Sequence, residues 1–365
     1  MLEFQYESFY LILPYCWFFF LNWFFFFKTN FYTVRIKTVK NDSLKRSNVN
    51  KKFHFSLIIY WGLLNLAPVV CLLATTRGVS GLFLWDHLNS NNLATKIIVL
   101  ILICNFFFLI LIFFLKFSKI SYNTDYVFAL LNLNNFFPLL FLANNLFTMF
   151  FVLEVNSTII FYKFIMSKIW YGRTKTNQKN SKNVLDKNLS QNYINVLFFQ
   201  YWTTFFSSTL FLFILINIIY LFGSTDFSFL NFMEYSLSCR GCYLNNAYKS
   251  ILLVTLLFSI MLKIGFAPLQ LFKIEVYKGI PFISIFFYTT FYFLVYFLFF
   301  SLLLIVHLYV FNNEFYYPLM IFIILGGLFI ISLFFDVIAL KAFFAYSSLI
   351  NSILFLSLLL GGTVT

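Results

Sequence analysis

Charged side chains are scarce in this protein: they make up only 10% of its 365 residues, while 62% are hydrophobic. Soluble globular domains carry about 25% charged residues. A chain with this balance cannot keep its apolar surface away from water around a single core. The composition therefore excludes a soluble enzyme, a soluble nucleic-acid-binding protein and a disordered chain.

Glycine (12), cysteine (5) and histidine (3) are also few. The sequence contains no phosphate-binding glycine loop, no paired histidines for haem and no cysteine set for an iron–sulfur cluster. Cys239 and Cys242 form a CxxC, but a metal site needs two more ligands, and no nearby His or Cys supplies them. A local disulfide stays open for this pair. We expect no cofactor and no metal in this chain.

Phenylalanine is the most conspicuous residue that is present, with 58 copies beside 23 tyrosines. Lipid requires apolar side chains but has no preference for Phe over Leu, Ile or Val. An excess of Phe with little Gly and Pro is typical of A+T-rich coding, as in some organelles. The remaining class is an integral membrane protein with several spans.

Ten stretches are long enough to cross a bilayer, whose hydrocarbon core of about 30 Å needs roughly 20 apolar residues per helix. They are too long and too aromatic for the strands of a membrane barrel. We therefore predict an all-α integral membrane protein with about ten transmembrane helices. The predicted spans cover residues 8–27, 54–76, 96–116, 126–143, 144–166, 194–222, 247–271, 281–308, 317–335 and 342–361.

Basic residues are distributed unevenly about these spans. The loops after spans one and five carry fourteen of them, within residues 28–52 and 168–187, and six more lie at span ends on the same side. The opposite side has four. The positive-inside rule makes the rich side the inner one and places the N-terminus on the other face. The net charge of +13 is thus read as a topology signal rather than a nucleic-acid site.

Three lysines in that count are Lys163, Lys273 and Lys341, which the sequence places at the basic face of the membrane. The stretch 173–192 is polar and has little apolar periodicity. We predict that it is disordered or covered by a partner.

Only two charged residues fall in the middle of a predicted span: Glu154 in span five and Lys263 in span seven. An ionised group there costs at least about 2.5–3.5 kcal/mol on insertion scales, and such groups usually mark ion pathways. The alternative is structural: Glu154 as a neutral, hydrogen-bonded acid, or Lys263 as its counter-ion.

Glu154 lies on a polar stripe of its helix. Ser157, Thr158 and Tyr162 follow it at +3, +4 and +8, so they share its face, as a proton relay requires. In span seven, Pro268 follows Lys263 by five residues. Proline cannot donate its backbone hydrogen bond there.

We therefore expect the helix of span seven to kink or break at Pro268. Gly265 loosens the same turn. The free carbonyls at such a break stabilise a buried ammonium. An ordinary kink in a membrane helix is the alternative. Asparagines in spans four and five either line a wet interior or join helices by hydrogen bonds; they are Asn132, Asn134, Asn135, Asn144 and Asn145.

The run KIGFAPLQLFKIEVYKGIP resembles the K-x-G-x-x-P-F-H-x-W-x-P-x-V-Y-x-G-A-P signature of proton-pumping NADH:quinone oxidoreductase, respiratory complex I, in its antiporter-like chain 2. Matching positions are Lys263, Gly265, Pro268, Val276, Tyr277, Gly279 and Pro281. Two further runs, NNLFTMFFVLEVNSTIIFY and LKAFFAYSSLINSILFLSLLL, resemble other parts of the same family. The resemblance extends from about span four to the C-terminus.

The resemblance implies an antiporter-like fold with a broken seventh helix. Residues 1–125 would hold three N-terminal helices, 126–308 the helix repeat of spans four to eight, and 309–365 the start of a second repeat. It also implies a multi-pass protein of the mitochondrial inner membrane, encoded in the organelle, with basic loops in the matrix and the N-terminus in the intermembrane space.

The same resemblance implies that Glu154 and Lys263 form a switching pair for proton transfer. Proton translocation would be coupled to NADH:ubiquinone electron transfer, so the chain would be an enzyme subunit with no redox centre of its own. NADH, FMN, iron–sulfur clusters and ubiquinone would lie elsewhere in the complex, and the partners would be its other membrane subunits and lipids.

Three departures from the family pattern stand out. Gln270 and Phe272 replace a histidine and a tryptophan. The next span normally carries a second buried lysine, but its face here has Tyr288, Thr289 and Thr290 followed by a further tyrosine. The sequence also shows ten spans where the family form has fourteen. We expect a separate polypeptide to supply the last four.

Two other functions remain open: a secondary cation/proton antiporter subunit, and a structural spacer of complex I that has lost pumping. The missing lysine in span eight favours the spacer. Glu154 and Lys263 argue against it, because a pure spacer has little reason to keep buried charges.

Overall fold

The computed structural model describes residues 81–83, 87–114, 124–172, 183–240, 246–266, 271–280, 282–308, 311–334 and 340–364. The predicted spans at 8–27 and 54–76 and the basic loop between them lie outside these residues. The described residues divide into two compact units. One contains residues 81–143 and 158–172, and the other contains residues 144–157 and 183–364.

The first unit begins with a short antiparallel hairpin of β1 (Gly81–Phe83) and β2 (Leu88–Ser90). Two apolar helices follow and pack on each other: α4 (Asn92–Phe114) and α5 (Thr124–Leu142). The strands were not predicted, because three residues each are too few to show an alternating pattern. Both helices match predicted spans to within a few residues.

Helix α6 (Leu146–Gly172) begins in the second unit. Asn145 caps its start, since the side-chain oxygen accepts the backbone N–H of Thr148 at 2.8 Å. Asn145 also forms a β-bridge with Asp226. Its side chain thus stabilises the start of its own helix, and its backbone links that start to the residue before α8.

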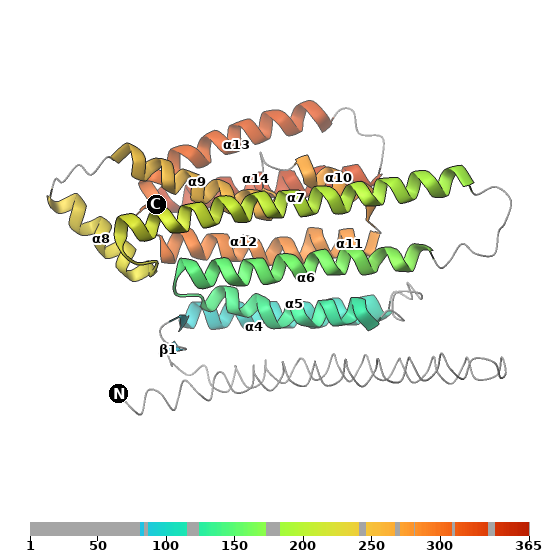
Figure 1. The fold of residues 1–365 in the computed structure, drawn as a ribbon, viewed down its shortest axis with the longest axis horizontal. Helices are drawn as coiled ribbons and strands as arrows, with labels where there is room; N and C mark the ends of the chain where they lie inside the picture. The colour runs from blue at the N-terminus through green and yellow to red at the C-terminus, as the bar shows by residue number, and fades with distance from the viewer. Residues whose placement is uncertain are drawn as a thin grey trace. The chain divides into compact units, whose positions relative to one another are not determined.

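The second unit is a bundle of helices in which α7 packs against both α9 and α10 (Figure 1). Helices α13 and α14 pack together, and α10 also contacts α14. Their bounds are α7 (Asn183–Phe222), α8 (Phe227–Arg240), α9 (Asn246–Ile264), α10 (Leu271–Gly279), α11 (Phe282–Phe287), α12 (Phe293–Leu302), α13 (Asn312–Phe334) and α14 (Leu340–Val364).

The π-helical segment η3 (Tyr288–Tyr292) joins α11 to α12, and a second one, η4 (Leu303–His307), continues α12, so that all four form one membrane-length span. A π-turn inserts an extra residue into the helix and often lies at a functional site. Here the first one contains part of the tyrosine face that replaces the expected lysine.

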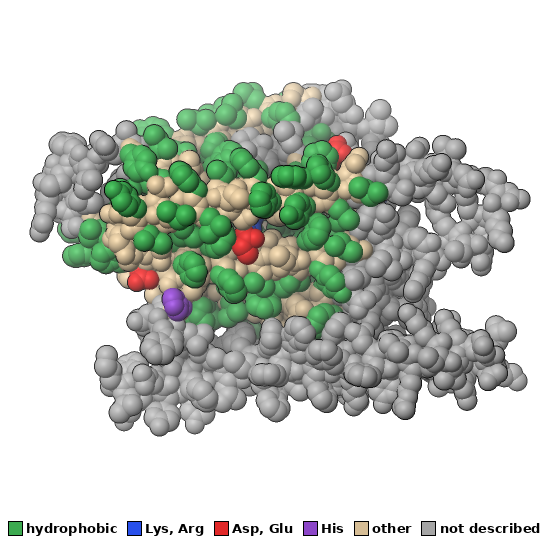
Figure 2. Space-filling model, viewed as in Figure 1, with side chains coloured by type: hydrophobic (Ala, Val, Ile, Leu, Met, Phe, Trp, Pro, Cys, Tyr) green, Lys and Arg blue, Asp and Glu red, His purple; other side chains and the backbone are tan. Residues whose placement is uncertain are grey.

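Outward-facing side chains of these helices are apolar, as lipid requires. Phe213, Ile216 and Leu328 are each at least 60% exposed, and hydrophobic side chains cover most of the described surface that Figure 2 shows. Helices satisfy their own backbone hydrogen bonds, which is why they can carry such surfaces into a bilayer.

Among the described residues, five helices are long and apolar enough to cross a membrane, and three further apolar helices are shorter. The prediction of an all-α membrane protein is confirmed. Disorder, one of the two alternatives predicted for residues 173–192, was wrong for residues 183–192, which belong to α7. Residues 173–182 lie outside the described residues, and cover by a partner stays a prediction. Helix α8 was also missed, since its mixed composition resembles a loop.

The predicted break in span seven is present. Helix α9 ends at Ile264, and Gly265 adopts φ +76°, a conformation that favours glycine. The amides of Gly265 and Phe266 both donate to the carbonyl of Met261, at 2.8 and 3.1 Å, which closes the helix end. The next helix, α10, begins at Leu271. Pro268 itself lies outside the described residues.

Candidate functional site

Glu154 of α6 and Lys263 of α9 form an ion pair in the second unit. They are 109 positions apart in sequence. The side chain of Lys263 is 5% exposed and that of Glu154 is 29% exposed. The two mid-span charges that the sequence singled out are thus brought into direct contact.

Lys263 lies in the last turn of α9, beside the break. The carbonyl end of a helix carries partial negative charge, which stabilises an ammonium there. Its Nζ also lies 5.8 Å from the ring centre of Phe150. Phe150 in turn stacks on Phe211 of α7, with ring centres 5.4 Å apart. Three helices therefore position the ammonium of Lys263.

Of the polar side chains predicted to follow Glu154 along its helix, Ser157 lies at this site. The hydroxyl of Ser157 donates to the backbone carbonyl of Glu154 at 2.8 Å and lies 3.5 Å from its Oε2. Thr158 is exposed and Tyr162 is half-buried. Ser157 thus lies within reach of the carboxylate.

Gly265 brings the two halves of the broken helix close together. A Cβ at this position would lie 2.9 Å from Cζ of Phe272 and 3.4 Å from Cδ of Lys273. Glycine is thus required here both for its positive φ and for the close approach of α10. At the other end of α10, the ammonium of Lys341 donates to the carbonyl of Ile280 at 2.9 Å.

Two lysines that the sequence placed at the basic face are buried instead. Lys163 and Lys273 are each 1% exposed. Both side chains are therefore shielded from solvent, and the side of the membrane on which they lie stays a prediction. A lysine in a polar stretch such as FKIEVYK resembles an interfacial residue, and only the packing of α10 against α7 and α14 removes Lys273 from solvent.

Lys273 lies at the helix break, close to aromatic rings of the next span. Its Nζ is 3.4 Å from the carbonyl oxygen of Gly265. It is also 5.6 Å from the ring centre of Tyr288 and 5.7 Å from that of Phe293. Electron-rich ring faces and a carbonyl both attract an ammonium.

Buried tyrosines form a row along this span. Ring centres of Tyr288 and Tyr292 are 4.3 Å apart in a stacked arrangement, and those of Tyr292 and Tyr296 are also 4.3 Å apart. Tyr277 of α10 meets Tyr288 edge to face at 5.6 Å. All four are at most 4% exposed. We call Tyr288, Tyr292 and Tyr296 the tyrosine row.

The predicted threonines of this span do not belong to the row. Thr289 and Thr290 donate to the carbonyl of Phe286 in their own helix, at 3.2 and 2.7 Å, and Thr290 is exposed. Tyr296 was missed, although its i, i+4 spacing from Tyr292 signals a shared face. The abundance of tyrosine in this chain hides that signal.

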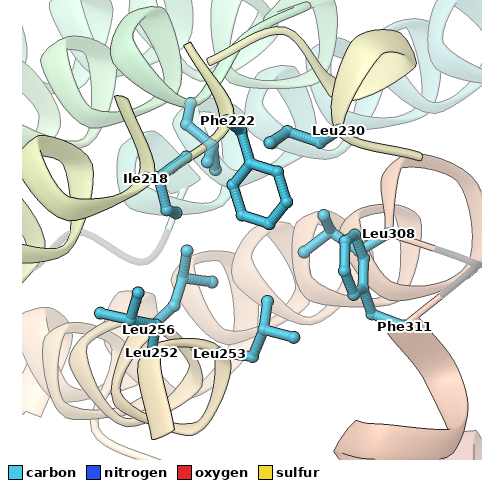
Figure 3. Close-up of a pocket in the computed structure, with 9 residues that line it drawn as sticks. Ile218, Phe222, Leu230, Leu252, Leu253, Leu256, Leu308 and Phe311 are labelled. Carbon is cyan, nitrogen blue, oxygen red and sulfur yellow. The ribbon is translucent and has the colours of Figure 1, made fainter. Parts of the chain in front are cut away.

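A small cavity in the second unit is not part of this site. It holds about 20 Å³ and is lined entirely by Leu, Ile and Phe side chains, among them Ile218, Leu230 and Leu308 (Figure 3). Such a lining offers a water no hydrogen-bond partner. Leu256 on its wall lies seven residues before Lys263, or roughly 10 Å along the helix.

The described residues contain no group of three or more His, Cys, Asp and Glu side chains that could hold a metal ion. Cys242 and the side chain of Cys239 lie outside the described part of the chain. The polar side chains that the structure places at the site are a carboxylate, amines, hydroxyls and phenols.

Comparison with known proteins gives one informative match. An uncharacterised mitochondrial protein of Paramecium tetraurelia, named ORF4, is 38% identical over 79 residues, which are 21% of this chain and 50% of that protein. The chain thus spans about half the length of that protein. No known family model matches the sequence. The match and the apolar helices together indicate a mitochondrial membrane protein.

Proposed function

We propose that this chain is a membrane-arm subunit of respiratory complex I in the mitochondrial inner membrane. It contributes there to proton translocation coupled to NADH:ubiquinone electron transfer. The observation that carries this proposal is the ion pair between Glu154 and the buried Lys263 at the end of α9. Two lines support it further: the resemblance of the KIGFAPLQLFKIEVYKGIP run to complex I, and the likeness to a mitochondrial protein.

The pair suits proton transfer because the free energy of keeping Lys263 charged depends strongly on whether Glu154 is ionised or protonated. While Glu154 is ionised, it compensates the charge of Lys263, which is only 5% exposed. When Glu154 takes up a proton, the ammonium of Lys263 is left without its counter-charge in an apolar surrounding. It is then driven to release its own proton or to move. Protonation at one residue thus changes the proton affinity of the other.

In this proposal the chain supplies no redox chemistry. NADH, FMN, iron–sulfur clusters and ubiquinone belong to other parts of the complex, and this chain works beside other membrane subunits. Its own part is to bind, hold and pass protons.

Purification tests the assignment to complex I. The chain, extracted in mild detergent, should co-migrate with a large assembly that oxidises NADH. Recovery as a free transporter that exchanges a cation for protons would favour the antiporter instead.

Variants of the pair test the pumping role. In the purified assembly reconstituted into vesicles, Glu154→Gln or Lys263→Met should lower the number of protons moved per electron. Tyr317→Phe is a suitable control because Tyr317 is 74% exposed. An unchanged ratio in both pair variants, with intact assembly, would leave the chain as a structural spacer.

A further inference from the structure

We propose that the first unit binds water between the middles of α4 and α5, through the side-chain amides of Asn105, Asn132 and Asn135. For the asparagines of span four, the sequence left two alternatives open: a wet interior or hydrogen bonds between helices. It did not single out Asn105. The inference concerns these two helices alone and does not depend on the assignment to complex I.

Asn105 is a polar side chain on the buried, otherwise apolar face of α4. Its side chain is 1% exposed. Ile101, Leu102 and Phe108 lie three or four residues from it, so they share its face of the helix, and they are at most 6% exposed. Phe107, on the other side of α4, is 62% exposed. The amide of Asn105 therefore faces the interior of the unit.

Four amide atoms of these asparagines are buried without a hydrogen bond to any part of the chain that the structure describes. They are Nδ2 and Oδ1 of Asn105, Oδ1 of Asn132 and Nδ2 of Asn135. Asn132 and Asn135 are three residues apart, so they share a face of α5. Buried polar groups in native proteins are nearly always paired with protein or with ordered water. Burial without a partner costs free energy, so these atoms require one.

The two helices bring the amides to a similar level of the unit. Helices α4 and α5 pack on each other (Figure 1). An antiparallel bridge between Leu88 and Ala143 joins the chain just before α4 to the chain just after α5, so the helices run in opposite directions. Asn105 lies near the middle of the 23-residue α4, and Asn132 and Asn135 lie near the middle of the 19-residue α5.

The mixture of donors and acceptors fits water better than a metal cation. Oxygen atoms bind a hard cation, whereas the Nδ2 groups of Asn105 and Asn135 present hydrogen atoms to it. A buried cation also needs a compensating charge. The acidic residue of these two helices is Asp125, seven positions or roughly 10 Å along α5 from Asn132. Water both donates and accepts, and a buried water makes about three hydrogen bonds.

Radiolytic labelling detects such water directly. A short X-ray pulse splits bound water into hydroxyl radicals, which oxidise the side chains beside it, and mass spectrometry locates the products. The full chain would be labelled within its native assembly in lipid nanodiscs. Phe108 follows Asn105 by three residues. Phe128 precedes Asn132 by four. Each ring thus lies on the same helix face as one of the amides.

We expect Phe108 and Phe128 to be oxidised, although they are only 6% and 7% exposed. Phe300 serves as the internal control. It is 0% exposed, and its ring meets that of Phe266 edge to face. Because its surroundings are apolar, Phe300 should stay unlabelled.

Two substitutions at Asn105 test the part that the amide plays. Asn105→Leu has the same branched shape without a polar atom, and oxidation of both rings should fall to the level of Phe300. Asn105→Ser keeps a hydroxyl and leaves room for water, so the labelling should be retained. Phe107→Leu is the matched control on the exposed side of α4 and should leave the labelling unchanged.

Two results would overturn the proposal. If Phe108 and Phe128 of the wild-type protein are labelled no more than Phe300, the asparagines join helices directly and without water. If labelling persists unchanged in Asn105→Leu, the water does not depend on the amide. Neither result bears on pumping, which the ratio of protons to electrons in Glu154→Gln tests by itself.

Discussion

At the scale of single residues, the two members of the ion pair differ in burial, and this difference has consequences for stability. Lys263 is 5% exposed and Glu154 is 29% exposed. Breaking a buried pair by removing one partner costs about 3–5 kcal/mol, because the other charge remains buried and uncompensated. The cost should therefore depend on which partner is left behind.

We expect Glu154→Leu to destabilise the protein more than Lys263→Met. Glu154→Leu leaves the more buried ammonium unpaired, whereas Lys263→Met leaves a carboxylate that is 29% exposed. The double variant should recover part of the loss, since no charge is then left without a partner. Thermal unfolding of the purified protein in one detergent checks the order. Equal losses for the two single variants, and additive losses in the double variant, would contradict this account.

At the scale of elements, the break between α9 and α10 determines where three buried side chains of the site lie. It ends α9 directly after Lys263, directs α10 back into the bundle, and carries Lys273 and Tyr277 with it. Gly265 allows α10 to approach the end of α9. At the other end of α10, the ammonium of Lys341 in α14 donates to the carbonyl of Ile280. The break is therefore a structural requirement of the site.

Two glycine substitutions test this requirement. Gly265→Ala should destabilise the protein, because a non-glycine residue at positive φ costs about 1–2 kcal/mol and the added Cβ would meet Phe272 at 2.9 Å. Gly327→Ala in α13 is the matched control, since a Cβ there has nothing within 4 Å. It should be neutral or stabilise by up to about 1 kcal/mol.

Thermal unfolding of both variants gives the comparison, and proton transfer in Gly265→Ala should fall as well, because the last turn of α9 carries Lys263. A Gly265→Ala protein as stable as Gly327→Ala would show that α10 does not depend on this close approach.

The same elements explain what could and could not be read from the sequence. Hydropathy predicted the helical spans well, because lipid demands long apolar runs, and Gly265 with Pro268 predicted the break. Hydropathy did not reveal that Lys273 is buried, since burial there depends on contacts between α10, α7 and α14. Nor did it reveal that Tyr277 meets Tyr288 edge to face, because that contact joins residues of different helices.

At the scale of the whole molecule, the direction of the helices relates the site to the two faces of the membrane. The apolar part of α7, Ile194–Phe222, is a helix of 29 residues, or roughly 44 Å, which exceeds the hydrocarbon thickness of about 30 Å. We therefore expect its two ends to lie on opposite faces. The start of α6 lies with the far end of α7, because Leu146 donates to the carbonyl of Thr225.

This geometry gives a topology prediction for the loops. Single cysteines at Ser43 and Gln178, in the two basic loops of the sequence, should react with a membrane-impermeant maleimide from the same side. A cysteine at Ser224, after the end of α7, should react only from the opposite side.

Wild-type protein gives the background from its native cysteines. Sealed mitochondria and inverted inner-membrane vesicles present the two sides separately, and the positive-inside rule places the basic loops in the matrix. Labelling of Gln178→Cys and Ser224→Cys from one and the same side would mean that α7 does not cross the membrane. Proton transfer at the Glu154–Lys263 pair would then have no direction across the membrane.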